Sequence, residues 1–494
     1  KCENYRASPR AGKKINEGNW MVRGLMWFRS DLRIDDNPAL LEAANSCDEL
    51  IGIYIFSQKQ WNLHHESNVK QDFLIQNLIT LEKQLRKLHI PLIVLKTDTF
   101  KVLSESLQKF IDTHQINSCH WNNEFGVNEN KRDDAVEKLL GENNIQISRH
   151  HDQVVYEPGF LRTGQDKPFS VFTPFKRRWI ENFSMSFLDL DKAEKPLKKT
   201  NLTSDLSALK LEKSHQVNMD AWPAGEANAL ARLQEFLDYK INNYSESRNT
   251  PILEGTSRIS AYLALGIISP RRCILEALKL NNFEFASGNL GICKWVDEIV
   301  WREFYRNIMH SFPKVSCNQP FQDYTRDIPW RQSSYEIEAF KTGNTGFPII
   351  DAAIKQMLAE GWMHNRLRMI VAMFFTKNML HDWRIGEQFF MEHLIDGDFA
   401  SNNGGWQWSA STGTDAAPYF RIFNPITQSQ NFDPTGEFIK KFIPELSDTS
   451  VKNIHQPTQD LFSELNYPKP ILDLKESRQR AILAFKETRD AQAL

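Results

Sequence analysis

The stretch VRGLMWFRSDLRIDDNPALLEAANSCDELIGIYIF (22–56) decides the fold of the first part of the chain. Its two apolar runs, at 22–28 and 50–56, are rich in β-branched and aromatic residues, a composition typical of buried strands. Between these runs, residues 37–45 place apolar side chains at helical spacing. The stretch therefore predicts a strand, a helix and a second strand, which is the repeating unit of a parallel sheet.

The same alternation continues to about residue 149. PLIVLK (91–96) and INSCHW (116–121) have the composition of two further buried strands. Segments with helix-period apolar residues accompany the strands at 68–89, 101–114 and 128–140. We therefore expect an α/β domain over 21–150, a Rossmann-like parallel sheet with helices on both faces. The GxGxxG signature of dinucleotide binding does not follow the first strand.

The rest of the chain divides into segments of different composition. Residues 1–20 are polar and basic, and we expect them to be a disordered or non-native extension ahead of a start at Met21. Residues 151–222 include a long stretch without periodicity, so we expect an interdomain connection that lies over the surface. From 223 to 494 strand patterns nearly vanish, which predicts a larger all-α domain. Its predicted helices include 226–243, 290–311, 347–360 and 363–380.

Length, charge and cysteine usage exclude several classes of protein. A chain of 494 residues exceeds the size at which a single core stops growing, so two domains are expected. The formal net charge is −2, so a nucleic-acid surface must be a local basic patch. The apolar runs are too short to cross a membrane, and residues 1–20 do not form a secretory signal. Six scattered cysteines without a CxxC pair fit reduced thiols, so we expect a cytoplasmic protein and, without a coiled-coil pattern, a monomer.

Two motifs in the helical part carry polar groups at helical spacing. GTSRIS (255–260) offers backbone N–H groups, hydroxyls and a cation to a phosphate, although it also fits a helix N-cap before a helix at 259–266. On the helix 290–311, Glu298 and Trp301 share a face with Arg302. A carboxylate beside an indole can bind a base edge while the ring stacks on the base. The alternative is an amphipathic helix with an intrahelical Glu298–Arg302 pair.

A third motif, WMHNRLRM (362–369), predicts a helix with two differently directed arginines. Asn365, Arg368 and Met369 fall on one face, whereas Arg366 lies about 100° around the helix and must have a different partner. One of the arginines can pair with a buried carboxylate. The stretch that follows at 394–408 supplies candidates for that carboxylate.

In LIDGDFASNNGGWQW (394–408), Asp396 and Asp398 flank a glycine and small polar residues precede Trp406 and Trp408. This composition favours backbone packed closely against a ligand, with a tight surface turn as the alternative. No metal-ligand spacing, nucleophile elbow or Walker lysine occurs in the sequence, so we expect no metal. A tryptophan-rich helical domain without hydrolytic residues indicates a bound aromatic cofactor that performs the chemistry.

At these motifs the chain resembles the photolyase/cryptochrome family, and within it the class I bacterial cyclobutane-dimer photolyases. The resemblance runs from WFRSDLRIDDNPAL (27–40) to NPITQSQNFDPTGEFI (424–439), and DGDFASNNGGWQWSASTGTDAAPYFRIFNP (396–425) is its most specific part. It implies a DNA-repair lyase, a flavoprotein that holds FAD in the helical domain. The partner that it implies is damaged DNA carrying a pyrimidine dimer, which flips out of the duplex and is split by an electron from the light-excited, reduced flavin. A bacterial, nucleoid-associated protein is implied as well.

The resemblance also implies roles for individual residues. The positions that match the family's FAD phosphate and ribitol contacts are Tyr244, Thr256, Ser257, Arg258 and Ser260. Those that match its contacts around the isoalloxazine are Asp396, Asp398, Asn402 and Arg368, with Arg368 paired to Asp396 and Asn402 beside flavin N5. The matching electron-transfer chain is Trp406, Trp383 and Trp330.

The dimer pocket carries over in the same way. Its matching positions are Glu298, Trp301, Asn365, Arg366, Met369 and Trp408. Glu298 is implied to hydrogen-bond the pyrimidine edge, a role that burial favours by keeping a carboxyl protonated. Candidate phosphate or pocket-rim contacts are Arg248, Arg366 and Arg421.

An antenna pigment is implied in the cleft beside the first domain. His64, Asn128 and Glu129 match positions that hold a folate antenna, 5,10-methenyltetrahydrofolate. Where the family often places a lysine, this chain has Cys317. The change removes a cation that can pair with the folate's glutamate tail, so we expect weaker antenna binding.

Two other functions remain open within the same resemblance. One is a blue-light sensor of the cryptochrome type, but such sensors carry a long regulatory tail, and here a charged helix at 475–490 closes the sequence. The other is repair of a different lesion or of single-stranded DNA. Relatives that prefer single strands usually lose the residues that match Trp408 and Met369, and this chain has both.

Overall fold

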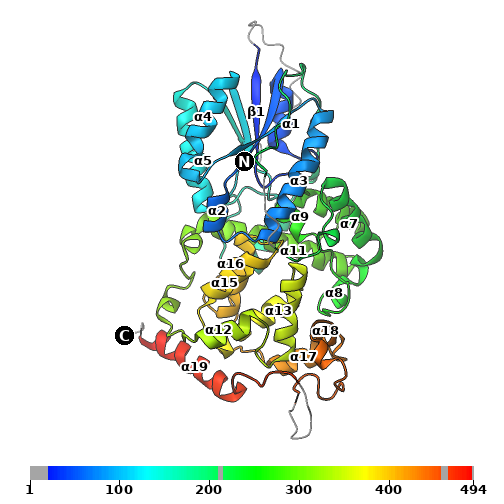
Figure 1. The fold of residues 1–494 in the computed structure, drawn as a ribbon, viewed down its shortest axis with the longest axis vertical. Coiled ribbons are helices and arrows are strands. Elements are labelled where there is room, and N and C mark those ends of the chain that lie inside the picture. Colours follow the sequence, from blue (N-terminus) through cyan, green and yellow to red (C-terminus); the bar gives the residue numbers. More distant parts are fainter. Residues whose placement is uncertain (1–20, 210–214, 458–465, 492–494) are drawn as a thin grey trace.

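A computed structural model describes residues 21–209, 215–457 and 466–491 (Figure 1). The expectation for residues 1–20 lies outside the described residues. The upper part of Figure 1 is a five-stranded parallel sheet in the order β3-β2-β1-β4-β5. Its strands are β1 (Arg23–Phe28), β2 (Glu49–Phe56), β3 (Leu92–Lys96), β4 (Ser118–Asn122) and β5 (Gln146–His150).

Four of these strands were predicted, and β5 was missed. Its sequence QISRH is polar and only partly buried, so it lacks the apolar run that marks the other strands. The helices that cover the sheet are α1 (Pro38–Ser46), α2 (Gln58–Leu63), α3 (Asn68–Lys87), α4 (Leu103–His114) and α5 (Val127–Glu142). The start of α1 is fixed by Asn37, whose side chain accepts from the Leu40 N–H, and by Pro38 in the first turn.

The alternation of side chains along β1 builds a core on each face of the sheet. Met26 and Phe28 pack in one cluster with α1 and α3, whereas Leu25 and Trp27 pack in another with α4 and α5. Figure 1 shows these two helix pairs on opposite sides of the strands. The predicted α/β domain with helices on both faces is therefore confirmed.

The connection 151–222 is not confined to the surface, so that expectation was wrong. It contains α6 (Phe172–Glu181), and Tyr156, Phe175 and Trp179 are fully or almost fully buried. The Glu303 carboxylate binds this segment because it accepts hydrogen bonds from the backbone of residues 155 and 156 and from the Trp179 indole. Phe172, Phe175 and Trp179 stand at i, i+3 and i+7 on α6, so the sequence did carry a helical signal for this packing that the surface expectation left unused.

The remaining chain is helical, as predicted. Its helices are α7 (Glu226–Tyr239), α8 (Tyr244–Ser247), α9 (Ser260–Ala264), α10 (Pro270–Leu280), α11 (Leu290–Ser311), α12 (Ser334–Lys341), α13 (Pro348–Glu360), α14 (Asn365–Met373), α15 (Trp383–His393), α16 (Phe399–Ala410), α17 (Pro425–Phe432), α18 (Glu437–Phe442) and α19 (Leu474–Ala491). The bounds predicted for α11 are those observed. The helix predicted at 363–380 is shorter, because α14 passes into a π-turn at Phe374–Asn378.

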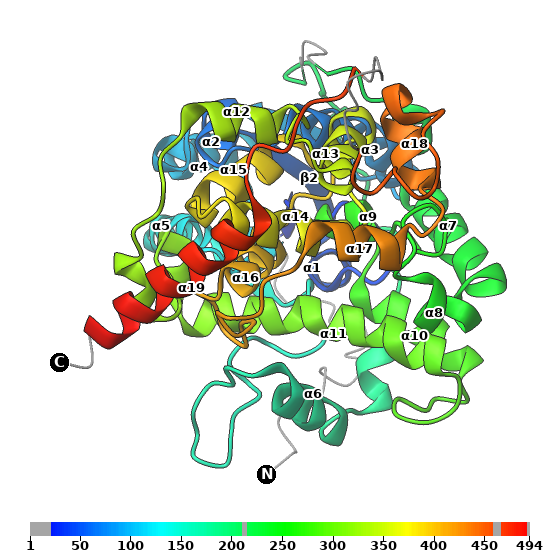
Figure 2. The same cartoon turned by 90° about the horizontal axis from the view of Figure 1, so that it is seen from below.

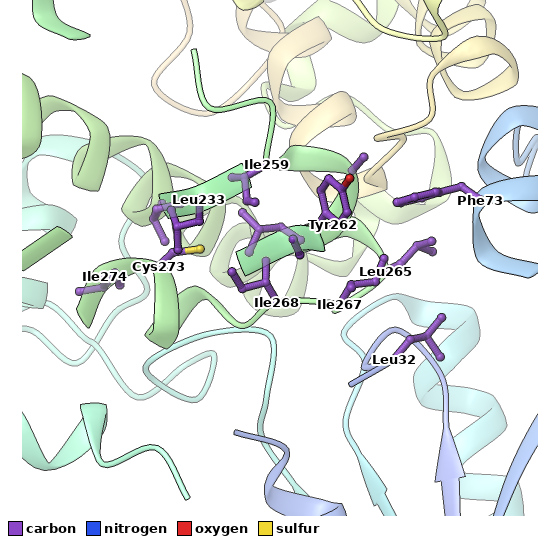
Figure 3. Packing of buried hydrophobic residues seen from close by; sticks show 14 of the residues in the cluster. Leu32, Phe73, Leu233, Ile259, Tyr262, Leu265, Ile267, Ile268, Cys273 and Ile274 are labelled. Atoms are coloured by element: carbon purple, nitrogen blue, oxygen red, sulfur yellow. The ribbon is translucent and has the colours of Figure 1, made fainter. Parts of the chain in front are cut away.

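One hydrophobic core runs from the sheet into the helical part. Figure 3 shows Leu32 and Phe73 near Tyr262 and Leu265, and the rings of Phe73 and Tyr262 meet edge-on at 5.3 Å. Gly266 has a positive φ of 62°, and a side chain there would collide with the Ser30 backbone. The two parts therefore pack tightly against each other, which fixes the position of the helical site relative to the sheet.

Candidate functional site

A cavity of about 370 Å³, the central cavity, opens between α8, α11, α14 and α16. It is lined by predicted site residues: Arg248, Glu298, Trp301, Asn365, Arg368, Met369, Asp396, Asp398, Asn402, Trp406 and Trp408. A second cavity of about 260 Å³, the adjoining cavity, is also lined by Glu298, Arg368, Asp396 and Asp398. The other predicted residues that line it are Tyr244, Thr256, Ser257, Arg258 and Ser260. The residues predicted for two ligands thus border one continuous space.

The start of α14 directs its side chains as the helical spacing predicted. Asn365, Arg368 and Met369 line the central cavity, whereas Arg366 points to the Asn249 side chain at 2.6 Å. His364 caps the helix, since its Nδ1 accepts from the Arg366 N–H. Burial, assisted by the nearby arginines, lowers the pKa of His364 to about 3, so the ring stays neutral and can accept this bond.

Asp396 is held in place by two partners at the boundary of the cavities. Arg368 donates to both of its carboxylate oxygens, at 2.8 and 3.0 Å, and the Ser260 hydroxyl donates at 2.7 Å. The expected Arg368–Asp396 pair is therefore present. Both of these contacts to Asp396 come from one guanidinium nitrogen of Arg368, and the Ser260 hydroxyl adds a third donor that fixes the position of the carboxylate.

Asp398 is a partly buried acid that keeps its charge. It caps α16 by accepting from the Ser401 N–H at 2.9 Å, and it pairs with Arg306 at 2.5 Å. Burial alone would raise its pKa, but Arg306 and Arg302 hold the pKa of Asp398 well below its usual range. Asp396 and Asp398 thus place two oriented carboxylates beside the central cavity.

Arg302 borders both cavities and has no acidic side chain of the described residues within ion-pair distance. Its guanidinium donates to the backbone carbonyls of Gln153 and Leu263. Burial, and then the charge of Arg306, lowers its pKa to about 9. A desolvated cation of this kind favours an anion in the cavity. Helical spacing puts Arg302 on the predicted face of α11, but no ligand-binding role was predicted for it.

Glu298 pairs with Arg248, at 2.6 Å, and not with Arg302 one turn along α11. The alternative of an intrahelical pair is therefore wrong. Burial raises the pKa of Glu298, and Arg248 opposes this shift. The position combines a carboxyl whose pKa is raised with a neighbouring indole, Trp301.

The stretch 399–410 forms helix α16, so the alternative of a surface turn is wrong. Gly404 packs against the Tyr305 ring too closely for any side chain, whereas a Cβ at Gly405 would project into open space of the central cavity. Asn402 donates to the Glu387 carbonyl at 2.9 Å, which leaves its Oδ1 as an acceptor. Backbone and amide groups of α16 are therefore open to a ligand, as the small residues indicated.

The three tryptophans of the predicted electron-transfer chain lie in or against one hydrophobic core cluster. Trp406 and Trp383 are almost fully buried, and Trp330 is partly buried and packs on the same cluster. Trp406 borders the central cavity, and its ring lies over Gly386, where no side chain would fit. The arrangement extends from the cavity wall into the protein.

GTSRIS (255–260) does not act as a side-chain cap. The cap position of α9 is Ile259, which makes no side-chain hydrogen bond, so that alternative is wrong. Ser257 accepts from the Trp295 indole at 3.2 Å. The Arg258 guanidinium lies 4.5 Å from the Trp362 ring and 3.6 Å from Glu360, so its charge is already partly balanced.

A third cavity of about 380 Å³, the interdomain cavity, lies between the α/β part and α15 and α16. His64, Asn128 and Glu129 line it together, and Asn128 lies within hydrogen-bonding distance of His64 at 3.1 Å. Ser316 lines this cavity, whereas Cys317 is exposed and does not. Arg421 is also exposed and lines none of the three cavities.

Comparison with known proteins finds the same two-part organisation. The family described as DNA photolyase matches residues 24–198, and the family described as FAD binding domain of DNA photolyase matches residues 295–487. The deoxyribodipyrimidine photo-lyase of Buchnera aphidicola is 40% identical over 95% of this chain and 98% of its own length, and that of Escherichia coli is 38% identical over 95% and 99%. The solved structure of a bacterial class III photolyase from Agrobacterium tumefaciens is similar with a TM-score of 0.87 and 31% identity, covering 97% of this chain and 100% of that one. In the described residues no helix combines the length and apolarity needed to span a bilayer.

Proposed function

This chain belongs to the DNA photolyase family, and from that premise we propose that it is a deoxyribodipyrimidine photo-lyase, which splits cyclobutane pyrimidine dimers in DNA with the energy of light. The observation that carries this proposal is the shared wall of the central and adjoining cavities. A base between Trp301 and Trp408 would border a cofactor held at Asp396 and Asp398. Close approach of substrate and cofactor is what electron transfer between them requires.

The residues present fit FAD. Arg302 supplies a desolvated cation for the diphosphate, and Thr256, Ser257 and Ser260 supply hydroxyls at the adjoining cavity. Gly405 leaves open space for a flat ring system beside Asn402. Bound FAD, in its reduced and light-excited state, supplies the electron that opens the cyclobutane ring.

The chain's own residues bind and orient the dimer. Trp301 and Trp408 are half-buried indoles on two different helices, suited to stack on the two extruded pyrimidines. The raised pKa of Glu298 favours a protonated carboxyl that donates to a pyrimidine carbonyl. Met369 and Trp408 exclude water from the same wall. These residues therefore set the geometry in which the cyclobutane ring opens to give two separate bases.

We assign Trp406, Trp383 and Trp330 to a separate task, the reduction of oxidised flavin in the light. Their shared cluster starts at the central cavity and ends at a partly buried ring. Substituting Trp330 by Phe should slow photoreduction strongly while leaving repair by chemically reduced enzyme intact. Equal photoreduction rates in the wild type and this variant would show that Trp330 takes no part in the electron transfer.

We further propose that the interdomain cavity binds a folate antenna, 5,10-methenyltetrahydrofolate. His64, Asn128 and Glu129 gather there, and burial followed by the charge of Glu124 raises the pKa of Glu129. A carboxyl in this position can bind the amino group of a pterin. Because Cys317 supplies no cation to the glutamate tail, we expect folate to be lost readily on purification.

The experiment that tests the function compares lesions. Flavin-reduced protein is illuminated with oligonucleotides carrying a cyclobutane thymine dimer or a (6-4) photoproduct, each in duplex and single-stranded form. Restored thymines from the cyclobutane dimer in duplex DNA support the proposal. Repair confined to the (6-4) photoproduct or to single strands would assign the chain to a different lesion, and bound flavin without any repair would favour a sensor.

A further inference from the structure

The structure points to Phe172 as a positioning residue: we propose that Phe172, in the connection 151–222, holds the Trp301 ring in the orientation that stacks on the extruded dimer. The inference rests on the proposed function, because it gives Trp301 its ligand. It makes the connection part of the DNA-binding site, a role that no motif in this segment indicated.

The contact itself is a close parallel stack. Phe172 opens α6, and its ring centroid lies 3.6 Å from that of Trp301 with only 9° between the two planes. Phe172 is buried, whereas Trp301 is half-buried and lines the central cavity. An indole has two faces, and with one covered by Phe172 the other remains for a ligand. Figure 2 shows α6 alongside α11, the helix that carries Trp301.

The Trp301 ring is fixed from the side as well. Phe304 meets it edge-on at 5.6 Å, and Tyr305 lies tilted at 5.7 Å. Neither contact is a close parallel stack like that with Phe172. A base can stack on Trp301 only if the indole keeps its orientation. The stack with Phe172 therefore restrains the rotation of the indole away from that orientation.

The same segment is tied to the other tryptophan of the dimer site. The Phe172 N–H donates to the Asp415 carboxylate at 3.1 Å, and the Thr414 hydroxyl donates to the Ser170 carbonyl. Thr414 and Asp415 belong to the loop that follows α16, and that loop returns to α16 where the Ala417 N–H binds the Trp408 carbonyl at 3.2 Å. Residues 170–172 therefore link α11, which carries Trp301, to the loop that follows α16, the helix that carries Trp408.

Neighbouring aromatic residues show what a purely packing role looks like. Phe175 is fully buried and meets Phe304 at 5.3 Å. Phe169 is partly buried and meets Phe175 at 6.0 Å, with no ring contact to Trp301 among the described residues. Phe169 is therefore a matched control, an aromatic residue of the same segment that leaves Trp301 untouched.

The test measures binding in the dark, where repair does not interfere. Affinities for a thymine-dimer duplex and for the undamaged duplex are compared in wild type, Phe172→Leu, Phe172→Tyr and Phe169→Leu. Since an aromatic stack is worth roughly 2- to 10-fold in an equilibrium, Phe172→Leu should lose about that factor for dimer DNA only. Phe172→Tyr keeps the stack and should bind within about twofold of wild type, and Phe169→Leu should bind as wild type does.

Flavin content and Tm are measured on the same samples. Unchanged preference for dimer DNA in Phe172→Leu would overturn the proposal, as would an equal loss in Phe169→Leu. If Phe172→Leu does not fold, Thr414→Val decides: it releases Ser170 and should also weaken dimer binding, and wild-type affinity would contradict the proposal. Light-dependent repair by the wild type is scored separately, so a wild type that binds dimers without repairing them refutes the proposed function and not the role of Phe172.

Discussion

Arg248, at the end of α8, forms a 2.6 Å ion pair with Glu298 in the middle of α11. The pair crosses the wall of the central cavity, and Arg248 also lies 5.4 Å from the Tyr244 ring. Burial raises the pKa of Glu298 while Arg248 opposes the shift. A dimer that hydrogen-bonds to Glu298 would therefore compete with Arg248 for this carboxyl.

Replacing Glu298 by Ala should lower the quantum yield of repair more than it lowers DNA affinity. The stacking tryptophans still bind the dimer, but a hydrogen bond of about 1–3 kcal/mol to the pyrimidine edge is lost. Glu298→Gln keeps a donor and should retain most of the yield. Photon-counted repair is compared with dark binding, and an unchanged yield in Glu298→Ala would refute the role.

Replacing Arg302 by Met should weaken FAD binding by about tenfold or more, because a charged hydrogen bond to the diphosphate contributes about 1.5–3 kcal/mol. The Tm of the apoprotein should change little, because removal of a desolvated cation offsets the loss of its hydrogen bonds to the carbonyls of Gln153 and Leu263. Arg272→Met is the control, because Arg272 is paired with Asp35 and Glu276 away from the cavities. Wild-type flavin affinity in Arg302→Met would contradict the assignment.

We expect the stability of the protein to depend on pH because of Glu387, a neighbour of Asn402 and Asn403. Burial raises its pKa to about 7, against a hydrogen bond from Asn403 that lowers it. Because the folded state binds this proton more tightly, the stabilisation is complete below the unfolded pKa and is lost as the pH rises through about 7. Glu387→Gln mimics the protonated form and should flatten the decline of Tm between about pH 5 and 8. The exposed Glu338→Gln should keep the wild-type profile; a Glu387→Gln profile that declines in parallel with wild type would remove Glu387 as the cause.

Local geometry explains which parts of the site were predictable. The directions of Asn365 and Arg366 follow from the helical repeat alone, and both were predicted correctly. The partner of Glu298 was not, because Arg248 lies on a separate helix that only the tertiary fold brings near. The burial of the connection was missed although Phe172, Phe175 and Trp179 stand at the i, i+3 and i+7 spacing of a helix face, because the segment around them lacks a period.

The strands of the sheet show a similar limit of prediction from the sequence. The central strands β1 and β2 are recognisable by their apolar runs, because both faces of these strands are buried between helices. β5 is an edge strand with a half-buried, polar sequence, so composition gave no sign of it. The roles of the tryptophan chain and of the antenna residues came from family resemblance and still await direct tests.

Removing Arg366 should weaken DNA binding through a phosphate contact. The guanidinium has no acidic partner among the described residues; Asn249 holds it at 2.6 Å and the Phe432 ring lies 4.6 Å away. Arg366→Ala should reduce the slope of log affinity against log salt by about one unit, and so should Arg421→Ala. Lys279→Ala, on the distant α10, should leave the slope unchanged; an unaltered slope in Arg366→Ala would exclude a phosphate contact.

Restoring the missing cation should strengthen antenna binding. In Cys317→Lys, the added ammonium can pair with the glutamate tail of methenyl-folate, and an exposed pair of this kind contributes up to about 1 kcal/mol. Folate titration followed by absorbance should therefore show an affinity up to about fivefold higher. Cys317→Met controls for side-chain size. Absence of binding by wild type and Cys317→Lys at high micromolar folate would remove folate as the antenna.

Light-dependent repair tests the central claim most directly. Protein with its flavin reduced is mixed with a duplex oligonucleotide carrying one thymine dimer, divided into dark and near-UV-illuminated samples, and analysed by chromatography. We predict restored thymines in the illuminated sample alone. A dimer that persists under light in the presence of bound, reduced flavin would contradict the account, and Glu298 and Trp408 would then need a different ligand.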